Sequence, residues 1–232
     1  GNQTLFGGQG RDNLNATGKS VNLSGGEGND SLDAVGSIYE RGTRQRIQNG
    51  QAKLLGGEGD DRLVVNEYSN AELFGGGGND RLSAYDVRNN KLFGGEGDDS
   101  LYASTTGYTS NNTDGNSSLN ESVLLNGGSG NDTLSTYLQY TGGSNGAPVV
   151  NLDGGEGNDQ ITINGYANRA HTDTKLNISG GLGKDTIRIS ESQTGRFNQA
   201  TSDYGFSSVT IDAGADDDTI TVEGSLNTTI TT

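Results

Sequence analysis

The sequence predicts an all-β protein, a right-handed parallel β-roll or β-helix solenoid of about nine coils. Three observations favour this fold class. A glycine-rich turn motif recurs along the chain, apolar residues alternate with polar ones on both sides of each motif, and no stretch keeps a helical period. Because the repeat runs through nearly all of the 232 residues, we expect a single domain over 1–232.

The motif is clearest in Gly94-Gly95-Glu96-Gly97-Asp98-Asp99-Ser100-Leu101, which has the pattern G-G-x-G-x-D-x-L. Seven further copies, each ending on Leu or Ile, begin at Gly7, Gly25, Gly56, Gly75, Gly127, Gly154 and Gly180. A ninth, degenerate copy runs from Ala213 to Ile220 and lacks the first glycine. Glycine is needed where a tight turn takes a positive φ or where its backbone packs closely against a ligand.

The sixth residue of every copy is an aspartate, and we call these nine residues the turn aspartates. They are Asp12, Asp30, Asp61, Asp80, Asp99, Asp132, Asp159, Asp185 and Asp218. The shortest intervals between them are 18 and 19 residues, which is two strands and two turns. Each coil therefore carries one motif turn, and the nine turns should lie along one edge of the roll.

Strands are predicted on both sides of each turn by apolar residues with a period of two. The residues two before each glycine pair are Leu5, Leu23, Leu54, Leu73, Leu92, Leu125, Leu152, Ile178 and Ile211. The residues two after each aspartate are Leu14, Leu32, Leu63, Leu82, Leu101, Leu134, Ile161, Ile187 and Ile220. Stacked coils would turn each position into a column of like side chains, giving a narrow but continuous core.

The remaining length falls into loop insertions, which we expect on the side opposite the motif turns. They lie near 35–51, 103–121, 135–147, 164–174 and 190–207. In repeat proteins such insertions gather on one face, which is often the binding face. The first insertion carries Arg41, Arg44 and Arg46 in an acidic chain, so it could meet an acidic polymer or a neighbouring subunit, or be a solvated loop.

The turn motif has the chemistry of a site for a hard cation. Such cations take six to eight oxygen ligands from carboxylates and backbone carbonyls. A six-residue turn with few side chains can direct several carbonyls into one space, and the turn aspartate adds the charge. One turn is too short to surround an ion, so two stacked turns would share it, and nine turns allow up to eight sites.

The turns resemble those of the RTX (repeats-in-toxin) family, whose β-rolls bind Ca²⁺ between stacked turns. The resemblance implies that the turn aspartates are ligands, together with carbonyls of the glycines at positions two and four of the motif. These are Gly8, Gly10, Gly26, Gly28, Gly57, Gly59, Gly76, Gly78, Gly95, Gly97, Gly128, Gly130, Gly155, Gly157, Gly181 and Gly183. Family arrays usually carry motifs on both edges, whereas this chain should hold a single row of ions. In the degenerate last turn, Asp216 or Asp217 could take part.

Composition agrees with an exported protein whose folding depends on Ca²⁺. The formal net charge is -15 and the chain has no cysteine, so it has neither disulfides nor thiolate metal sites. No apolar run reaches membrane-spanning length. No signal peptide is present and the chain begins within a coil, so we expect a fragment or processed product. We expect bacterial secretion or a cell-surface location, no nucleic-acid partner, and coupled binding and folding.

No catalytic site is predicted. His171, the sole histidine, lies in a polar segment, and neither a G-x-S-x-G nor an H-E-x-x-H motif occurs. We therefore expect a structural protein: a module or subunit of a cell-surface layer, adhesin or filament. Neither end of the repeat shows a polar cap, so copies or neighbouring repeat domains could stack end to end.

Two other functions remain open. One is a carbohydrate-binding module, favoured by the arginines of the first insertion and by the tyrosines in or near the insertions. Alternatively, those tyrosines could stack on one another and cover the outside of the roll without binding a ligand. They are Tyr39, Tyr68, Tyr85, Tyr102, Tyr108, Tyr137, Tyr140, Tyr166 and Tyr204. The other function is an export or folding module of a larger secreted enzyme.

Overall fold

A computed structural model describes residues 1–40, 43–46, 50–106, 122–140, 149–167, 175–191, 208–223 and 228–231. Within these ranges the protein is built from β-strands and turns and contains no helix. A search of the same residues accordingly found no helix that could span a membrane. The predicted all-β class is confirmed.

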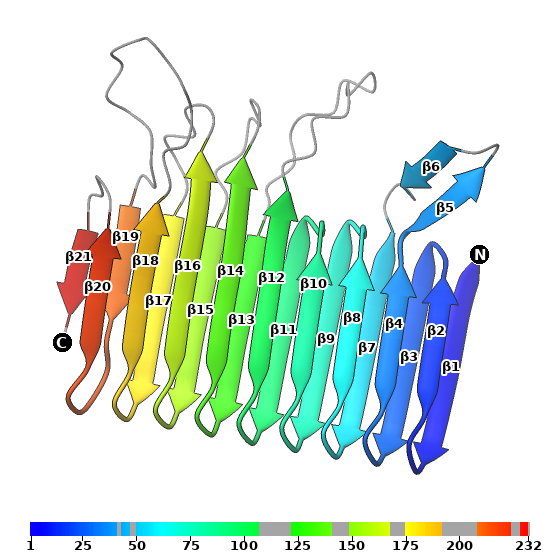
Figure 1. Ribbon diagram of the computed structural model, residues 1–232, viewed down its shortest axis with the longest axis horizontal. Helices are drawn as coiled ribbons and strands as arrows, with labels where there is room; N and C mark the ends of the chain where they lie inside the picture. Colours follow the sequence, from blue (N-terminus) through cyan, green and yellow to red (C-terminus); the bar gives the residue numbers. More distant parts are fainter. Residues whose placement is uncertain are drawn as a thin grey trace, which may run out of the picture.

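Two long parallel sheets form the body of the protein (Figure 1). The first sheet has ten strands in the order β1 (Asn2–Gln9), β3 (Ser20–Glu27), β7 (Gln51–Glu58), β9 (Asn70–Gly77), β11 (Asn89–Glu96), β13 (Ser122–Ser129), β15 (Val149–Glu156), β17 (Lys175–Leu182), β19 (Ser208–Asp212) and β21 (Thr228–Thr231). The second has nine strands in the order β2 (Asn13–Thr17), β4 (Ser31–Val35), β8 (Arg62–Asn66), β10 (Arg81–Tyr85), β12 (Ser100–Thr106), β14 (Thr133–Tyr140), β16 (Gln160–Ala167), β18 (Thr186–Glu191) and β20 (Thr219–Glu223).

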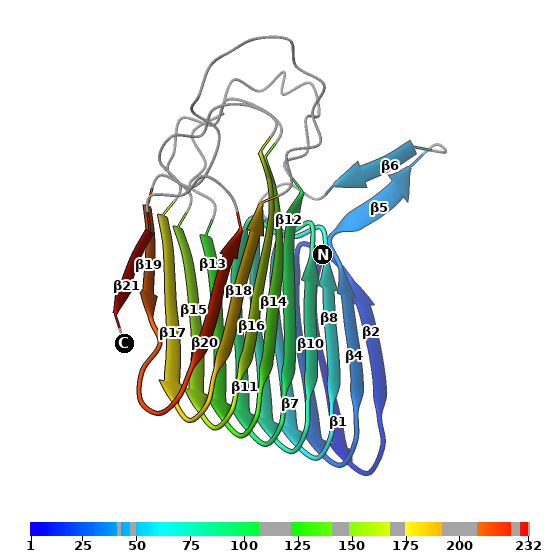
Figure 2. The ribbon, with the colours of Figure 1, turned by 60° about the vertical axis from the view of Figure 1, so that its left-hand side comes forward.

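The chain passes from one sheet to the other through each motif turn, so one strand of each sheet makes a coil. Nine coils result, and all nine motif turns lie in a row along one edge (Figures 1 and 2). We call this edge the aspartate edge. Equivalent residues pair in register: Leu92 of β11 lies between Leu73 of β9 and Leu125 of β13. The predicted coil number and single motif edge are both confirmed.

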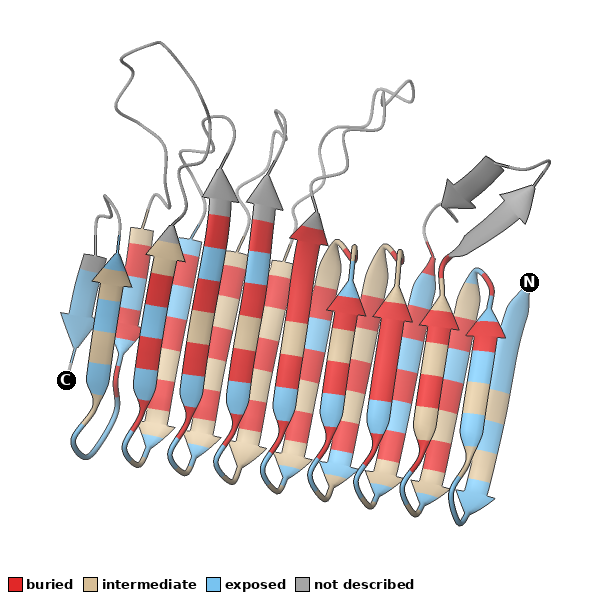
Figure 3. Cartoon of the chain, viewed as in Figure 1, coloured by how far each residue is buried: buried red, intermediate tan, exposed pale blue. Residues whose placement is uncertain are grey.

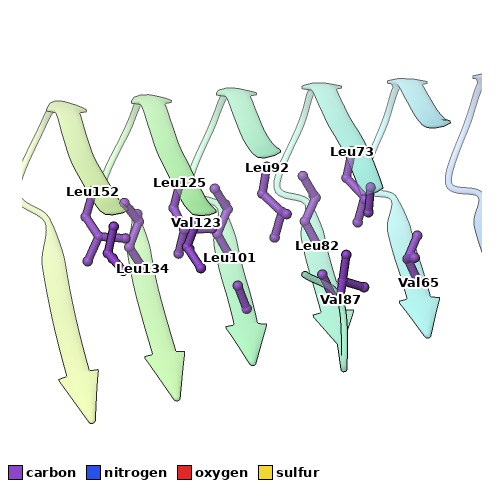
Figure 4. Close-up of a cluster of buried hydrophobic side chains, with 14 of the residues drawn as sticks. Val65, Leu73, Leu82, Val87, Leu92, Leu101, Val123, Leu125, Leu134 and Leu152 are labelled. Atoms are coloured by element: carbon purple, nitrogen blue, oxygen red, sulfur yellow. The ribbon is translucent and has the colours of Figure 1, made fainter. Parts of the chain in front are cut away.

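The core fills the space between the two sheets. Along most strands between the two end coils, buried residues alternate with exposed or half-buried ones (Figure 3). The predicted leucine and isoleucine columns point inward and pack against one another (Figure 4). The end coils are less protected, because Leu5, Leu14, Ile220 and Val222 are only partly buried. A narrow core with thinner ends leaves much of the stability to the edges.

Two expectations about the insertions need correction. The first insertion is not only a loop, because β5 (Ser37–Glu40) and β6 (Thr43–Arg46) form an antiparallel hairpin; Arg41 lies outside the described residues. The second-sheet strands β12, β14, β16 and β18 also run into the first residues of the later predicted insertions. Their strand pairing continues there, from Thr105 with Leu138 to Tyr140 with Ala167.

The tyrosines divide into two kinds. Tyr68 is fully buried, and its hydroxyl donates a hydrogen bond of 3.1 Å to the Val35 carbonyl oxygen, so it belongs to the core. Tyr85, Tyr102 and Tyr137 instead lie on the outer face of the second sheet, where Tyr85 and Tyr137 are exposed. The side chains of the other five predicted tyrosines lie outside the described residues.

Candidate metal centre

The glycines at positions two and four of the eight regular turns take positive φ values, as the tight turn requires. In the turn from Gly94 to Asp99, φ is 125° at Gly95 and 116° at Gly97. A Cβ atom on Gly95 would overlap the carbonyl oxygen of Gly76, and one on Gly97 would overlap that of Gly78. The second and fourth carbonyls of each turn therefore point along the roll towards the next coil.

One oxygen of every turn aspartate after Asp12 joins its turn to the preceding one. The Oδ1 atom of Asp99 accepts a hydrogen bond of 2.8 Å from the peptide N–H of Asp80 in the preceding turn. The same bond occurs at all eight junctions between successive turns, with lengths from 2.7 to 2.9 Å. We call these junctions joints one to eight and this series of bonds the aspartate ladder.

The second oxygen of each turn aspartate has no such partner. In the first eight turns the Oδ2 atom is buried and accepts no hydrogen bond from the described residues. These atoms belong to Asp12, Asp30, Asp61, Asp80, Asp99, Asp132, Asp159 and Asp185. A buried acceptor left without a donor costs about 1–3 kcal/mol, and more when it is charged. A repeated cost of this kind indicates that each oxygen serves a ligand.

The first glycine of each turn leaves space beside this oxygen. A Cβ atom on Gly94 would overlap both the Oδ2 atom of Asp99 and the carbonyl oxygen of Gly127 in the next turn. The same two contacts recur at the first glycine of all eight regular turns, and the eighth uses the Ala213 carbonyl. At each joint two acceptors thus approach the same side of the first glycine, an arrangement that a cation bound by both would stabilise.

Burial raises the pKa of the six turn aspartates from Asp61 to Asp185, and neighbouring aspartates add to this effect at several of them. The pKa is raised to about 7 for Asp61 and Asp99, and to about 6 for Asp80, Asp132 and Asp159. Hydrogen bonds from the backbone of the preceding turn partly oppose this rise. The edge therefore resists the loss of these protons unless another positive charge replaces them.

The donor set fits a hard cation such as Ca²⁺. Within the described ranges, no three Asp, Glu or His side chains gather in a way that could hold a metal ion. An ion here would take one carboxylate oxygen per joint together with backbone carbonyls, and hard cations accept oxygen ligands of both kinds. The first carbonyl of the following turn was not among the predicted ligands. Its signal within the sequence was the pair of glycines that begins the eight regular motifs.

The degenerate ninth turn departs from this geometry. Strand β19 ends at Asp212, whereas the equivalent strands continue through the glycine pair. Asp216 replaces the glycine at position four and takes a φ of 85°. Asp217 forms an exposed ion pair with Lys184 at 3.3 Å. Asp218 keeps its ladder bond to the Asp185 N–H, so the ninth turn completes joint eight in an altered form.

A second series of hydrogen bonds, which the sequence analysis did not predict, joins the fifth residues of the turns. The Oδ1 atom of Asp98 accepts a 2.7 Å bond from the N–H of Asn131 in the next turn. Equivalent bonds, with acceptors from Asn29 to Asn158, link joints two to seven. We call this series the Asx ladder. Its signal was an Asp or Asn at the fifth position of turns two to seven.

The other predicted sites add little. His171 lies outside the described residues.

Comparison with protein families showed that the RTX calcium-binding nonapeptide repeat (four copies) matches residues 6–35, 55–86, 87–105, 124–137 and 151–162. A comparison with curated proteins found no match. The matched segments contain seven of the nine motif turns in whole or in part, so the family pattern and the aspartate edge coincide.

Proposed function

The chain belongs to the RTX calcium-binding repeat family, and from this premise we propose that Ca²⁺ ions are held at the joints between its turns. RTX repeats bind calcium; the proposal concerns which atoms do so here. The ligands at a joint are the Oδ2 atom of one turn aspartate, the first carbonyl of the following turn, and carbonyls of the glycines at motif positions two and four. The row of eight buried carboxylate oxygens without hydrogen-bond partners carries this proposal.

Binding at these joints would link ion uptake to folding. Without an ion, each joint holds converging acceptors and partly buried negative charge, and the whole chain has a net charge of -15. Eight divalent ions would bring 16 positive charges to one edge. Because the ligands come from two coils, they converge only when the coils are stacked, so the binding free energy becomes folding free energy.

The experiment is a calcium titration with two matched variants. We expect the wild-type chain to gain strand content by circular dichroism and to retain up to eight ions after gel filtration. Asp99→Asn should lose one ion. Asp98→Asn removes the same charge from the same turn, yet keeps the oxygen that accepts the Asn131 N–H, as Asn79 and Asn131 do at equivalent positions. It should keep every ion. Equal losses in both variants would contradict the proposed ligand set.

We propose that the ion-bound roll is a structural module of a bacterial surface layer, adhesin or filament. RTX repeat proteins are typically secreted by bacteria. In the part of the chain that the structure describes, strands β1 and β2 at one end and β20 and β21 at the other pair on one side only. Such strands favour pairing with another copy of the chain or with a neighbouring repeat domain. Head-to-tail contacts of this kind need not close and can give a fibre. Light scattering in calcium tests this: a strict monomer at high concentration would refute self-assembly.

A carbohydrate-binding role is the second candidate, and one observation favours it. The rings of Tyr85 and Tyr102 lie 5.4 Å apart with 44° between their planes. Tyr137 lies on the same face two strands away: Ser104 of β12 pairs with Tyr85 of β10 on one side and with Tyr137 of β14 on the other. Aromatic rings with one apolar face and one polar group suit sugar rings. A glycan array probed with the calcium-bound chain tests this role, and silence across the array would count against it.

A further inference from the structure

At joints two to seven the two ladders connect neighbouring turns in opposite directions. At a complete joint, the turn aspartate of the later turn accepts the N–H of the earlier turn. The fifth residue of the earlier turn accepts the N–H of the later turn. At joint five, these bonds are Asp99 N–H to Asp132 Oδ1 and Asn131 N–H to Asp98 Oδ1, both 2.7 Å long. Each of the two turns thereby donates one peptide N–H to a side chain of the other.

Joints one and eight have only half of this arrangement. The fifth residue is Arg11 in the first turn and Lys184 in the eighth, and neither side chain can accept a hydrogen bond. Both joints keep the aspartate ladder, with bonds of 2.8 Å and 2.9 Å. At joint eight the only fifth-position contact between side chains in the described structure is the ion pair of Lys184 with Asp217, and both of these side chains are mostly exposed. Exposed pairs of this kind contribute little.

We propose that the fifth residue of each turn is a positioning residue that sets the calcium affinity of the joint after it. The eight joints then form two classes: six tight ones, joints two to seven, and two weak ones that follow Arg11 and Lys184. This inference rests on the proposed function, because it assigns different affinities to the sites described there.

The physical reason lies in where the ladder bonds act. The ligands of one joint belong to two turns, so their convergence depends on the spacing and tilt of those turns. The Asx ladder fixes this spacing at the residue next to the turn aspartate. Where it is missing, the ion must itself hold the two turns in place and loses the entropy of ordering them. One hydrogen bond of ordinary strength corresponds to about a fivefold change in an equilibrium constant.

The backbone at joint eight is consistent with looser coupling. Strands β17 and β19 pair only as far as Ser179 with Asp212. The other first-sheet pairs that carry glycine pairs in both strands continue through the second glycine and the third residue, as Gly155 with Gly181 and Glu156 with Leu182. Beyond that pair, an isolated bridge between Leu182 and Ala215 replaces the continuous strand pairing at joint eight.

The test measures the release of calcium from the loaded full chain into an excess of fluorescent chelator. The wild-type chain should release two ions about fivefold faster than the other six. Lys184→Asn supplies the missing acceptor and should leave one fast ion, and adding Arg11→Asn should leave none. Lys184→Ala is the control, because it removes the charge and the ion pair without supplying an acceptor, and it should keep two fast ions.

The inner joints supply the reverse test. Asn131→Ala removes the acceptor for the Asn158 N–H and should create a third fast ion, whereas Asn131→Asp keeps the oxygen and should create none. Hydrogen exchange of the Asp217 amide gives a readout of the ladder itself. It should be slower in Lys184→Asn than in Lys184→Ala.

The outcomes separate this inference from the proposed function. Eight ions released at one rate, or equal effects of Lys184→Asn and Lys184→Ala, would overturn the positioning role and leave the calcium sites standing. A chain that retains no calcium would overturn the proposed function, and the inference with it.

Discussion

Replacing Asp99 by asparagine should stabilise the metal-free roll and weaken the calcium-bound one. The Oδ1 atom of an asparagine can still accept the Asp80 N–H at 2.8 Å. The buried Oδ2 atom becomes an amide nitrogen, which can donate to the Gly127 carbonyl oxygen instead of repelling it. The same change removes the charged ligand from joint five, so the two effects have opposite signs.

The magnitude follows from the pKa of Asp99, which burial raises to about 7. An aspartate in the unfolded chain has a pKa of about 3.9, so the folded, metal-free roll binds a proton more readily than the unfolded chain does. Above pH 7 this difference destabilises the metal-free roll by up to about 4 kcal/mol. Asp99→Asn removes that cost, and calcium removes it in the wild-type protein.

The assay compares folding with and without calcium at pH 7.5. In chelator, the chain is titrated with trimethylamine N-oxide, which favours burial of surface, and circular dichroism follows the strands. Asp99→Asn should fold at a lower osmolyte concentration than the wild-type protein, while in calcium its melting temperature should fall. Asp98→Asn is the control, because Asp98 is exposed, and it should change both values much less. A variant that folds less readily in chelator would refute the assignment of Asp99 as an uncompensated buried carboxylate.

Three further predictions use the same measurements. In chelator, the roll should gain stability as the pH falls from about 7 to about 4, because the turn aspartates with raised pKa take up protons in the folded state first; calcium affinity should fall over the same range, and a metal-free roll that weakens on acidification would contradict this. Gly94→Ala should lose the ion at joint five, because its Cβ atom would occupy the space beside Asp99 Oδ2. Gly8→Ala has open space and a φ of 119°, so it should keep its ion count and lose only about 1–3 kcal/mol to backbone strain. Tyr68→Phe loses the hydrogen bond to Val35 and should lower the free energy of unfolding in calcium by about 1 kcal/mol; Tyr102→Phe, on the outer face, is the comparison, and equal losses would argue against a core role for the Tyr68 hydroxyl.

The architecture follows from the amino-acid sequence alone, because a solenoid is built from local repeats. The period of the turn aspartates predicted one motif turn per coil, and nine coils with one motif edge are found. The columns that contain Leu73, Leu92 and Leu125 follow directly from the alternation, since a strand places every second side chain on the same face. The glycines at Gly95 and Gly97 were predicted from the turn they must form, and both have positive φ.

The atoms that meet between coils are known only once the coils are stacked in three dimensions. The two oxygens of Asp99 are identical in the sequence, yet one accepts the Asp80 N–H and the other stays buried beside Gly94. The hairpin of β5 and β6 and the burial of Tyr68 were likewise missed, because neither follows the repeat. The Asx ladder joins residues 19 to 33 positions apart. A repeat pattern shows that a turn recurs, but it does not show which hydrogen bonds form when two copies are stacked.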